Sequence, residues 1–515
     1  MDRRRFLATT GALSLLSAAG ELRAATSDFD PTEQSIAALM RALAAGTVTS
    51  EALAAAYLRR IARFDHHGPE YRSVLALNPN ALKDARALDS ERKSGKLRGP
   101  LHGIPIIVKD NIETRDPMAT TGGSYALVRS FRTADAPLAA RLRAAGAIIL
   151  GKANLSEWAN FRSTRSCSGW SGVGGQVRNA YDPARNPSGS SAGSGVAAAA
   201  SFCAAAIGTE TNGSILSPSS INGLVGLKPT VGVVSGTGVV PISPRQDTAG
   251  PMCRTVGDAA ILAAVIAERP LGFGAHGNDI EAFRLRGLRI GVMPVPQGAH
   301  PDTARLFADA RAVLEQEGAV TMDLKPPKAF DEMGEPEFEG LLYEFKDAIN
   351  AYLSTLDPSQ VDCRTLADLI AFNRAHADEE LIVFGQEIFE MAEAKGPLSD
   401  DAYQKALAAL KRTADVEGLA TLLAQGVEVL VGPSNGPADL IDPVWGDRRG
   451  GGSSQIAGAA ATAGYPSLTV PAGLVSGLPV GITLVTRRNQ DGLLLQVARA
   501  YERAANARVP PHLMI

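Results

Sequence analysis

The chain has 515 residues, of which 45% are hydrophobic and 20% are charged, an ordinary composition for a soluble globular protein. Lysine and arginine number 51 against 54 acidic residues, which gives a net charge of -3. No basic excess therefore favours binding to nucleic acid or to an anionic membrane surface.

The first 25 residues form a segment of their own. They have a basic start, an apolar middle and small residues at the end, which is the layout of a secretory signal peptide. The letters R-R-R-F-L at positions 3–7 also fit the twin-arginine pattern. The apolar run from Leu7 to Ala19 is too short for a good membrane span, so we expect no stable membrane insertion.

The sequence thus predicts a twin-arginine-type signal peptide over residues 1–25, cleaved near Ala24 or Ala25, and a periplasmic or secreted bacterial protein. The mature domain would then cover residues 26–515. The alternative for this segment is an amphipathic N-terminal helix or an uncleaved anchor.

The first half of the mature chain predicts helices followed by buried strands. Residues 31–88 carry apolar side chains at three- and four-residue intervals, which is typical of helices. The β-branched run from Gly103 to Asp110 predicts a buried strand, and residues 144–154 predict another strand after a helix. The fourteen mostly apolar residues from Gly195 to Gly208 predict a buried helix.

The second half continues the alternation of strands and helices. A helix is predicted over residues 303–317, and residues 335–426 are mostly helical and charged. Strands are predicted in GLRIGVMPV (287–295), AVTMDL (319–324), VEVLVGPS (427–434) and GITLVT (481–486). Because no Pro/Ser-rich linker divides the chain, the pattern indicates one α/β domain with helices covering a sheet.

The four cysteines, at positions 167, 203, 253 and 363, have spacings that match no metal-binding pattern. An oxidising compartment would permit disulfides, but we expect four free structural cysteines. Cys203 lies inside an alanine-rich run and is predicted to be buried.

A stretch rich in serine and glycine, NPSGSSAGSG at residues 186–195, permits several interpretations. A flexible linker is disfavoured because the stretch opens directly into an apolar run. A dinucleotide-binding fingerprint at residues 193–198 lacks both the preceding strand and the acidic residue that should follow. A hydrolase nucleophile elbow at residues 189–193 fits G-x-S-x-G and stays open as an alternative, although no strand precedes it.

A fourth interpretation joins this stretch to Lys109, at the end of a predicted strand, and to Ser214, in the second glycine-bearing turn GTETNGS. The segments LHGIPIIVKDNIET, NPSGSSAGSGVAAAA, AIGTETNGSI and AGYPSLTVPAGLVSGLPVGITLV carry a resemblance over about residue 31 to the end. On these segments the chain resembles the amidase signature family of serine hydrolases. The resemblance implies a single large α/β domain with a central mixed β-sheet covered by helices on both faces, and a catalytic core at about residues 95–265.

The resemblance implies a Ser–Ser–Lys triad, in which Ser214 is the nucleophile, Ser190 the bridging serine and Lys109 the base. It also implies a cis peptide bond between Gly189 and Ser190, and neither a metal nor a cofactor. A lysine can act as a base only when it is neutral, and burial favours the neutral amine. Lys109 follows four apolar residues of a predicted core strand, so its burial is expected.

The resemblance further implies an oxyanion hole made by the backbone N–H groups of Thr211, Asn212, Gly213 and Ser214. Asn212 departs from the commoner Gly-Gly pattern, and we expect a positive φ to be less accessible there. Leu216 stands where many members carry an arginine.

Other residues receive supporting roles. Ser191 is predicted to donate a supporting hydrogen bond, and Ser163 and Thr164 to line the acyl site. The pocket is predicted to be shaped by the helical region, chiefly residues 335–394, and by the loop 435–452. Residues 169–176 should pack near the catalytic layer, and structural roles are predicted for Asp110, Lys228 and Asp247.

The predicted function is hydrolysis of a carboxylic or peptide C-terminal amide to an acid and ammonia through a serine acyl-enzyme. The sequence most resembles the bacterial peptide amidase branch. An acylamidase for aryl or fatty amides is the alternative, and a catalytically silent binding protein on the same fold is the alternative of another class. The predicted partner is a small-molecule or peptide amide, and the predicted oligomeric state is a monomer or a homodimer.

Overall fold

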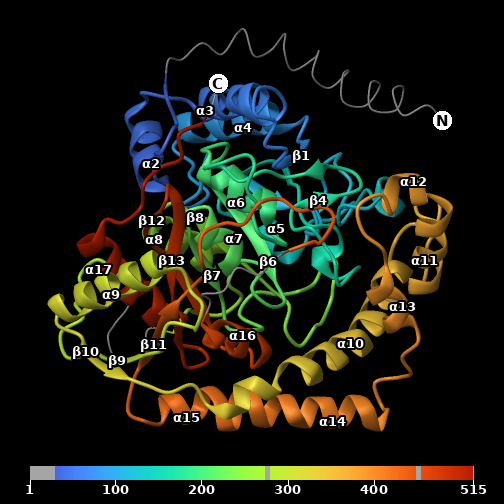
Figure 1. Ribbon diagram of the computed structural model, residues 1–515. Helices are drawn as coiled ribbons and strands as arrows, with labels where there is room; N and C mark the ends of the chain where they lie inside the picture. Colours follow the sequence, from blue (N-terminus) through green and yellow to red (C-terminus); the bar gives the residue numbers. More distant parts are fainter. Residues whose placement is uncertain (1–28, 273–278, 448–453, 514–515) are drawn as a thin grey trace.

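The computed structural model describes residues 29–272, 279–447 and 454–513. The predicted signal peptide over residues 1–25 lies outside these residues and stays a prediction. In the described chain the strands form an 11-stranded sheet and a two-stranded ribbon of β4 (Trp170–Ser171) and β5 (Gly175–Gln176) (Figure 1). The large sheet has the order β1 (Val74–Leu77), β3 (Ile148–Ala153), β2 (Pro105–Lys109), β6 (Ala205–Glu210), β8 (Thr248–Cys253), β7 (Val225–Lys228), β12 (Ser467–Val475), β13 (Leu478–Thr486), β11 (Val429–Pro433), β9 (Arg289–Val292) and β10 (Val320–Asp323).

The sheet is mixed, as the resemblance implies. Strand β2 runs parallel to both β3 and β6, and β9 runs parallel to β10 and β11, whereas the other neighbours are antiparallel. Every residue of β2 and β6 is buried. Because parallel neighbours end at the same edge of a sheet, Lys109 at the end of β2 and Glu210 at the end of β6 emerge together.

Helices cover both faces of this sheet (Figure 1). Helices that pack directly on its strands include α6 (Ala192–Ala199), α7 (Leu216–Ile221), α8 (Val256–Ile266), α9 (Pro301–Gln316), α16 (Gln455–Thr462) and α17 (Asp491–Ala505). Helix α3 (Ser50–Arg60) also contacts β2, and α4 (Ala81–Lys93) and α5 (Pro137–Ala144) contact β3, while α2 (Ile36–Ala45) packs against α8. Helix α3 begins at Ser50, where the Thr49 side chain caps it by accepting a hydrogen bond from the N–H of Ala52.

The predicted helical region is confirmed as an arc of helices along the periphery of the molecule (Figure 1). It consists of α10 (Gly334–Ser354), α11 (Leu366–Ala375), α12 (Ala377–Glu380), α13 (Glu387–Glu393), α14 (Asp401–Leu410), a π-helix (Lys411–Leu419) and α15 (Ala420–Leu423). The rings of Phe345 and Phe389 stack at 5.2 Å, and Trp158 and Phe161 of the core pack against them. This apolar cluster fixes the arc beside the loop that follows β3.

One sequence prediction of secondary structure is wrong. The apolar run from Gly195 to Gly208 is not one helix, since α6 ends at Ala199 and strand β6 starts at Ala205. Ser201 between them has a φ of 55°, which no helix continues. Strand β1 interrupts the largely helical segment 31–88, because it completes the sheet edge against β3.

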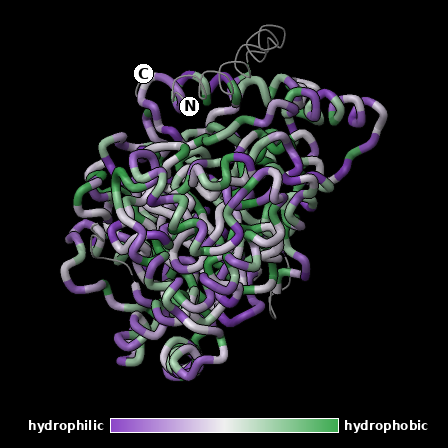
Figure 2. The backbone as a smooth tube through the Cα atoms, turned by 90° about the vertical axis from the view of Figure 1, so that its right-hand side faces the viewer, coloured by the Kyte–Doolittle hydropathy of each residue, from purple (hydrophilic) through white to green (hydrophobic). Residues whose placement is uncertain are grey.

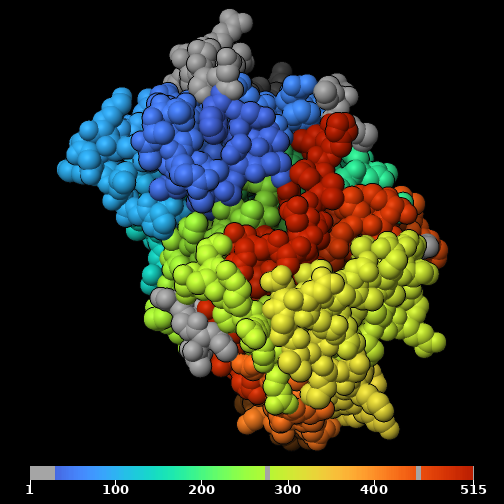
Figure 3. All heavy atoms as spheres, turned by 90° about the vertical axis from the view of Figure 1, so that its left-hand side faces the viewer, coloured from blue at the N-terminus to red at the C-terminus, as the bar shows by residue number. Residues whose placement is uncertain are grey.

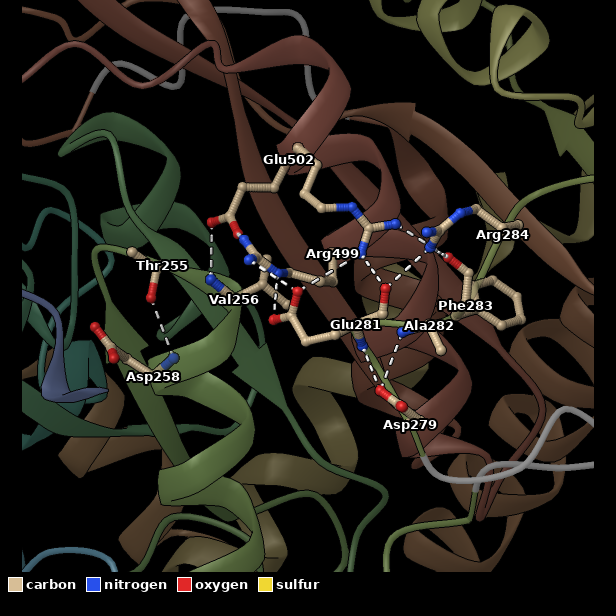
Figure 4. Close-up of polar contacts among 11 residues, drawn as sticks. Thr255, Val256, Asp258, Asp279, Glu281, Ala282, Phe283, Arg284, Arg499 and Glu502 are labelled. Carbon is tan, nitrogen blue, oxygen red and sulfur yellow. Dashed lines mark hydrogen bonds and ion pairs between the residues drawn. The ribbon is translucent and has the colours of Figure 1, made fainter. Parts of the chain in front are cut away.

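The two ends of the described chain lie near each other. Glu33 forms an ion pair with Arg508, and Figure 3 shows the N-terminal helices in blue beside the C-terminal segment in red. Figure 4 shows two further contacts, both of α17. Arg499 donates to Glu281 at 2.8 Å, and Glu502 accepts from the N–H of Val256 at 2.8 Å. These contacts bind the segment after residue 278 and helix α8 to α17.

Side-chain burial agrees with a globular core. Figure 2 shows hydrophobic residues through the interior and hydrophilic residues on many outer turns. All four cysteines are buried and unpaired, which confirms their prediction as free cysteines. None of the helices in the described ranges is long and apolar enough to cross a membrane.

Candidate active site

Lys109 lies at the end of β2 and is completely buried. Its Nζ is 2.8 Å from Ser190 Oγ, 2.9 Å from Thr209 Oγ1 and 3.4 Å from the Thr209 carbonyl oxygen. Burial lowers the pKa of Lys109 to about 7, and the negative charges of Asp247 and Glu210 oppose this shift only in part. A substantial fraction of the amine is therefore neutral at physiological pH.

Ser190 occupies the turn that precedes α6, and the peptide bond between Gly189 and Ser190 is cis. The turn is closely packed. A Cβ atom on Gly189 would lie 2.2 Å from Ser156 Oγ and 2.9 Å from Ser168 Oγ, so only glycine fits there. A Cβ on Gly169 would likewise meet the ring of Pro187 at 2.8 Å. The predicted packing of residues 169–176 near this layer is thus confirmed.

Ser214 lies in the turn between β6 and α7. Its carbonyl oxygen accepts a hydrogen bond from the N–H of Ser191 at 3.2 Å, which ties this turn to the turn of Ser190. Glu210 Oε2 accepts from the N–H groups of Ile215 and Leu216 at 2.7 and 3.0 Å and so anchors the start of α7. Ser214 is 8% exposed and lines a cavity.

Ser191 does not lie in the cavity wall. It is fully buried, its Oγ donates to the Thr209 carbonyl at 3.0 Å, and the same oxygen accepts from the Thr209 N–H at 3.2 Å. The hydroxyl that the G-x-S-x-G alternative requires at an exposed elbow is therefore bound to strand β6, as a supporting residue would be.

The four residues from Thr211 to Ser214 all line the cavity. Within the described residues, the N–H groups of Asn212, Gly213 and Ser214 have no protein acceptor, so they are free to bind a substrate oxygen. Gly213 has a φ of 82°, whereas Asn212 does not have a positive φ. The departure of Asn212 from the Gly-Gly pattern therefore causes no backbone conflict.

The cavity has a volume of about 790 Å³, and its lining includes both apolar and polar residues. The apolar lining residues include Phe161, Ile242, Met333, Phe338, Leu341 and Ile388. The polar lining residues include Asn160, Ser163, Thr164, Asn186, Asn435 and Asp447. Ser163 and Thr164 line the cavity, and the hydroxyls of both donate to Glu387 Oε1, at 2.8 and 2.7 Å.

The predicted pocket-shaping segments do reach this cavity. Helix α10 contributes Glu337, Phe338 and Leu341, and α13 contributes Ile388. The loop that starts at Asn435 contributes residues up to Asp447, and its remainder, 448–452, lies outside the described residues.

Three buried polar residues for which structural roles are predicted bind neighbouring protein groups. Asp247 accepts from Thr211 Oγ1 at 2.6 Å and from the N–H groups of residues 242 and 243, while burial raises its pKa to about 6. Lys228 is buried, which lowers its pKa to about 8, and its Nζ donates to the Pro229 carbonyl. Asp110 lies 3.7 Å from Lys152 in a fully buried pair.

Sequence reasoning missed four residues around the site: Thr209, Glu210, Gln246 and Glu337. The first two stand inside the motif GTETNGS, so their position next to Ser214 was a usable signal. Glu337 Oε1 accepts from Asn212 Nδ2 and from Gln246 Nε2, both at 2.8 Å. No motif in the sequence marks Glu337. In the described ranges, no group of three or more His, Cys, Asp or Glu side chains could hold a metal ion.

Comparison with known proteins agrees with this geometry. The family model described as Amidase matches residues 52–495. A probable amidase of Arabidopsis thaliana is 38% identical over 484 residues, which cover 90% of this chain and 88% of the relative. The crystal structure of the native peptide amidase from Stenotrophomonas maltophilia is similar, with a TM-score of 0.87 at 46% identity, and the match covers 94% of this chain and 99% of that one.

An amidase family protein from Bacillus anthracis is also similar, with a TM-score of 0.83 at 31% identity over 96% of this chain and 97% of that one. The family match spans most of the chain, and these relatives are similar over nearly their full lengths. The chain therefore belongs to the amidase signature family and is a hydrolase that acts on amide C–N bonds.

Proposed function

We propose that this enzyme hydrolyses C-terminal peptide amides to the free acid and ammonia, with Ser214 as nucleophile, Ser190 as proton relay and Lys109 as base. The observation that carries the proposal is the buried contact of 2.8 Å between Lys109 Nζ and Ser190 Oγ, next to the cavity that Ser214 lines. A buried amine with a pKa of about 7 can accept a proton at neutral pH.

The proposed reaction uses these three residues in turn. Neutral Lys109 takes the proton of Ser190, which takes the proton of Ser214 as the Ser214 oxygen attacks the amide carbon. The free N–H groups of residues 212–214 bind the oxyanion. Protonated Lys109 then returns a proton through Ser190 to the departing nitrogen, and ammonia leaves an acyl ester on Ser214. Water hydrolyses this ester to the acid and restores the serine.

The mixed lining of the cavity supports a peptide substrate. Its side-chain amides and hydroxyls can pair with peptide N–H and C=O groups, while its apolar residues can hold an apolar side chain. The 46% identity to a peptide amidase over 94% of the chain points the same way.

The substrate class is tested by measuring ammonia release from N-acylated dipeptide amides, simple aliphatic amides and long-chain fatty amides, with product release from anilides as the parallel assay. We expect the dipeptide amides to have the highest kcat/KM. The apolar residues that line the cavity keep the acylamidase alternative open, and faster turnover of anilides or fatty amides would favour it.

For location, we propose export to the periplasm by the twin-arginine route, which the R-R-R-F-L pattern supports. Replacing Arg3 and Arg4 by lysine should reduce periplasmic accumulation sharply while soluble protein remains in the cytoplasm. Unchanged export of this variant would contradict the twin-arginine assignment.

A further inference from the structure

We infer that Glu337 is a positioning residue, which holds the oxyanion-binding turn in place from helix α10 through the side chain of Asn212. The inference rests on the proposed role of residues 211–214. It assigns to the helical arc a part in the reaction in addition to shaping the pocket.

One carboxylate oxygen joins three separate segments. Glu337 Oε1 accepts from Asn212 Nδ2 at 2.8 Å, from Gln246 Nε2 at 2.8 Å and from Thr462 Oγ1 at 3.0 Å. Asn212 belongs to the turn after β6, Gln246 to the loop before β8, and Thr462 to the end of α16. Removal of this acceptor would leave all three donors without the bond that connects them to α10.

The turn needs such an anchor at Asn212. Gly213 has a φ of 82° and its missing Cβ would meet nothing within 4 Å, so no side chain restrains that residue. On the one side, Thr211 is held by Asp247 through its hydroxyl and by Gln246 Nε2 through its carbonyl, at 3.3 Å. On the other side, the Ser214 carbonyl is held by Ser191.

The Gln246 bond to the Thr211 carbonyl fixes the peptide plane that carries the Asn212 N–H. The Gly213 carbonyl accepts from the N–H of Ser217 at 2.8 Å, which fixes the plane that carries the Ser214 N–H. Among the described residues the Asn212 carbonyl has no such donor, so the orientation of the Gly213 N–H depends on the Asn212 side chain. A peptide plane that rotates by a few tens of degrees moves its N–H away from the oxyanion. Small displacements of this kind reduce kcat without a large effect on ground-state binding, because the oxyanion forms only in the transition state.

The test compares Glu337→Leu, Glu337→Gln, Asn212→Ala and the double variant Asn212→Ala/Glu337→Leu. The matched control is Glu339→Leu on the same helix, whose carboxylate pairs with Lys395 at 2.7 Å and does not contact the turn. The measurements are kcat and KM for ammonia release from N-acetyl-phenylalanine amide, the rate at which a serine-directed phosphonate labels the enzyme, and the thermal unfolding midpoint.

We expect Glu337→Leu and Asn212→Ala each to lose roughly 10- to 100-fold in kcat and in labelling rate, with KM within about 3-fold of wild type. The double variant should lose no more than the worse single variant, since both changes break one connection. Glu337→Gln should stay within about 3-fold of wild type, because its amide oxygen accepts the same bonds.

A wild-type kcat in folded Glu337→Leu would overturn the inference, as would a loss that appears mainly in KM or equal losses in Glu337→Leu and Glu337→Gln. Should Glu337→Leu fail to fold, the kcat of Asn212→Ala tests the inference instead. Asn212 is exposed, so its replacement should not prevent folding. If wild-type enzyme is not labelled on Ser214 at all, the proposed function fails instead. If labelling occurs and slows in the variants, the inference holds whatever amide is the substrate.

Discussion

Lys109 Nζ and Ser190 Oγ lie 2.8 Å apart, and both residues are completely buried. The two oxygen atoms of Thr209 are acceptors for the remaining hydrogens of the amine. A neutral Lys109 can therefore satisfy two N–H groups at Thr209 and direct its lone pair at the Ser190 hydroxyl. This arrangement makes specific predictions about pH and about replacement of the lysine.

The first prediction concerns the pH profile. Since the base must be neutral and burial lowers the pKa of Lys109 to about 7, kcat/KM should rise through about pH 7 and level off above it. Asp247 opposes that lowering, so Asp247→Asn should shift the rising limb to lower pH. Replacement of any of the seven histidines should leave the limb in place, and a limb that vanishes with a histidine would contradict the assignment.

Lys109→Arg should be nearly inactive. A guanidinium does not lose its proton in a protein, so it cannot act as a base. Loss of a general base costs about 10²–10⁴-fold in rate, which an assay of ammonia release detects readily. An arginine variant with near-normal kcat would mean that the positive charge matters and that Lys109 is an electrostatic anchor.

Lys109→Met should stabilise the protein as it inactivates it. Folding lowers the pKa of Lys109 from 10.5 to about 7, so the lysine must give up its proton on folding at any pH between these values. The free-energy cost of this deprotonation is absent above about pH 10.5 and grows as the pH falls to 7. The gain at pH 7 should reach up to about 4 kcal/mol, less the lost hydrogen bonds. Urea unfolding at pH 7 and pH 10 measures it, with exposed Lys96→Met as the control. Lower stability of Lys109→Met at both pH values would refute this reasoning.

Ser214→Ala and Ser191→Ala should separate two serines that the sequence alone leaves in competition. Ser214→Ala should fold normally and have no turnover. Ser191→Ala loses two bonds to Thr209, so it should cost roughly 1–3 kcal/mol of stability and keep most of its activity. Ser194→Ala, which loses a similar bond to Ile207, is the matched control. The intact mass after phosphonate treatment locates the nucleophile, and an adduct on Ser191 in active Ser214→Ala would restore the elbow interpretation.

The sequence predicts the residues that turns and strand ends place, and it misses those that only tertiary packing brings in. Lys109, Ser190 and Ser214 stand in local motifs, so the sequence alone can single them out as candidates, and the structure brings Lys109 into contact with Ser190. Glu337 is 125 residues from Asn212 and lies on a helix without a motif, so no local pattern could connect them. The alanine-rich run 195–208 has no periodicity that separates helix from strand, and its second half is a strand because it pairs with β2.

The last prediction concerns Arg162, a fully buried residue between two residues of the cavity wall, Phe161 and Ser163. Its Nη1 lies 2.9 Å from Glu157 Oε1 and 3.6 Å from Glu380 Oε2, and both carboxyl groups are fully buried. The Arg162 guanidinium therefore lies within ion-pair distance of both the Glu157 and the Glu380 carboxyl groups. Burial and the neighbouring Glu380 raise the pKa of Glu157 well above its usual range, and Arg162 partly opposes this rise.

Arg162→Met should therefore lower the free energy of unfolding by roughly 3–5 kcal/mol, because it leaves buried carboxyl groups without their cation. When folding raises the pKa of an acid, the protein loses stability as the pH rises from the unfolded-state pKa of that acid towards its folded-state pKa. Removal of Arg162 should raise the folded-state pKa of Glu157 further, which enlarges this loss. The deficit should consequently be larger at pH 8 than at pH 5, where the acids can take up protons. Urea unfolding at both pH values measures it, with Arg165→Met, an exposed neighbour, as the control. A deficit that is the same at pH 5 and pH 8 would show that Arg162 acts through packing on Phe384 and Trp170 instead of through its charge.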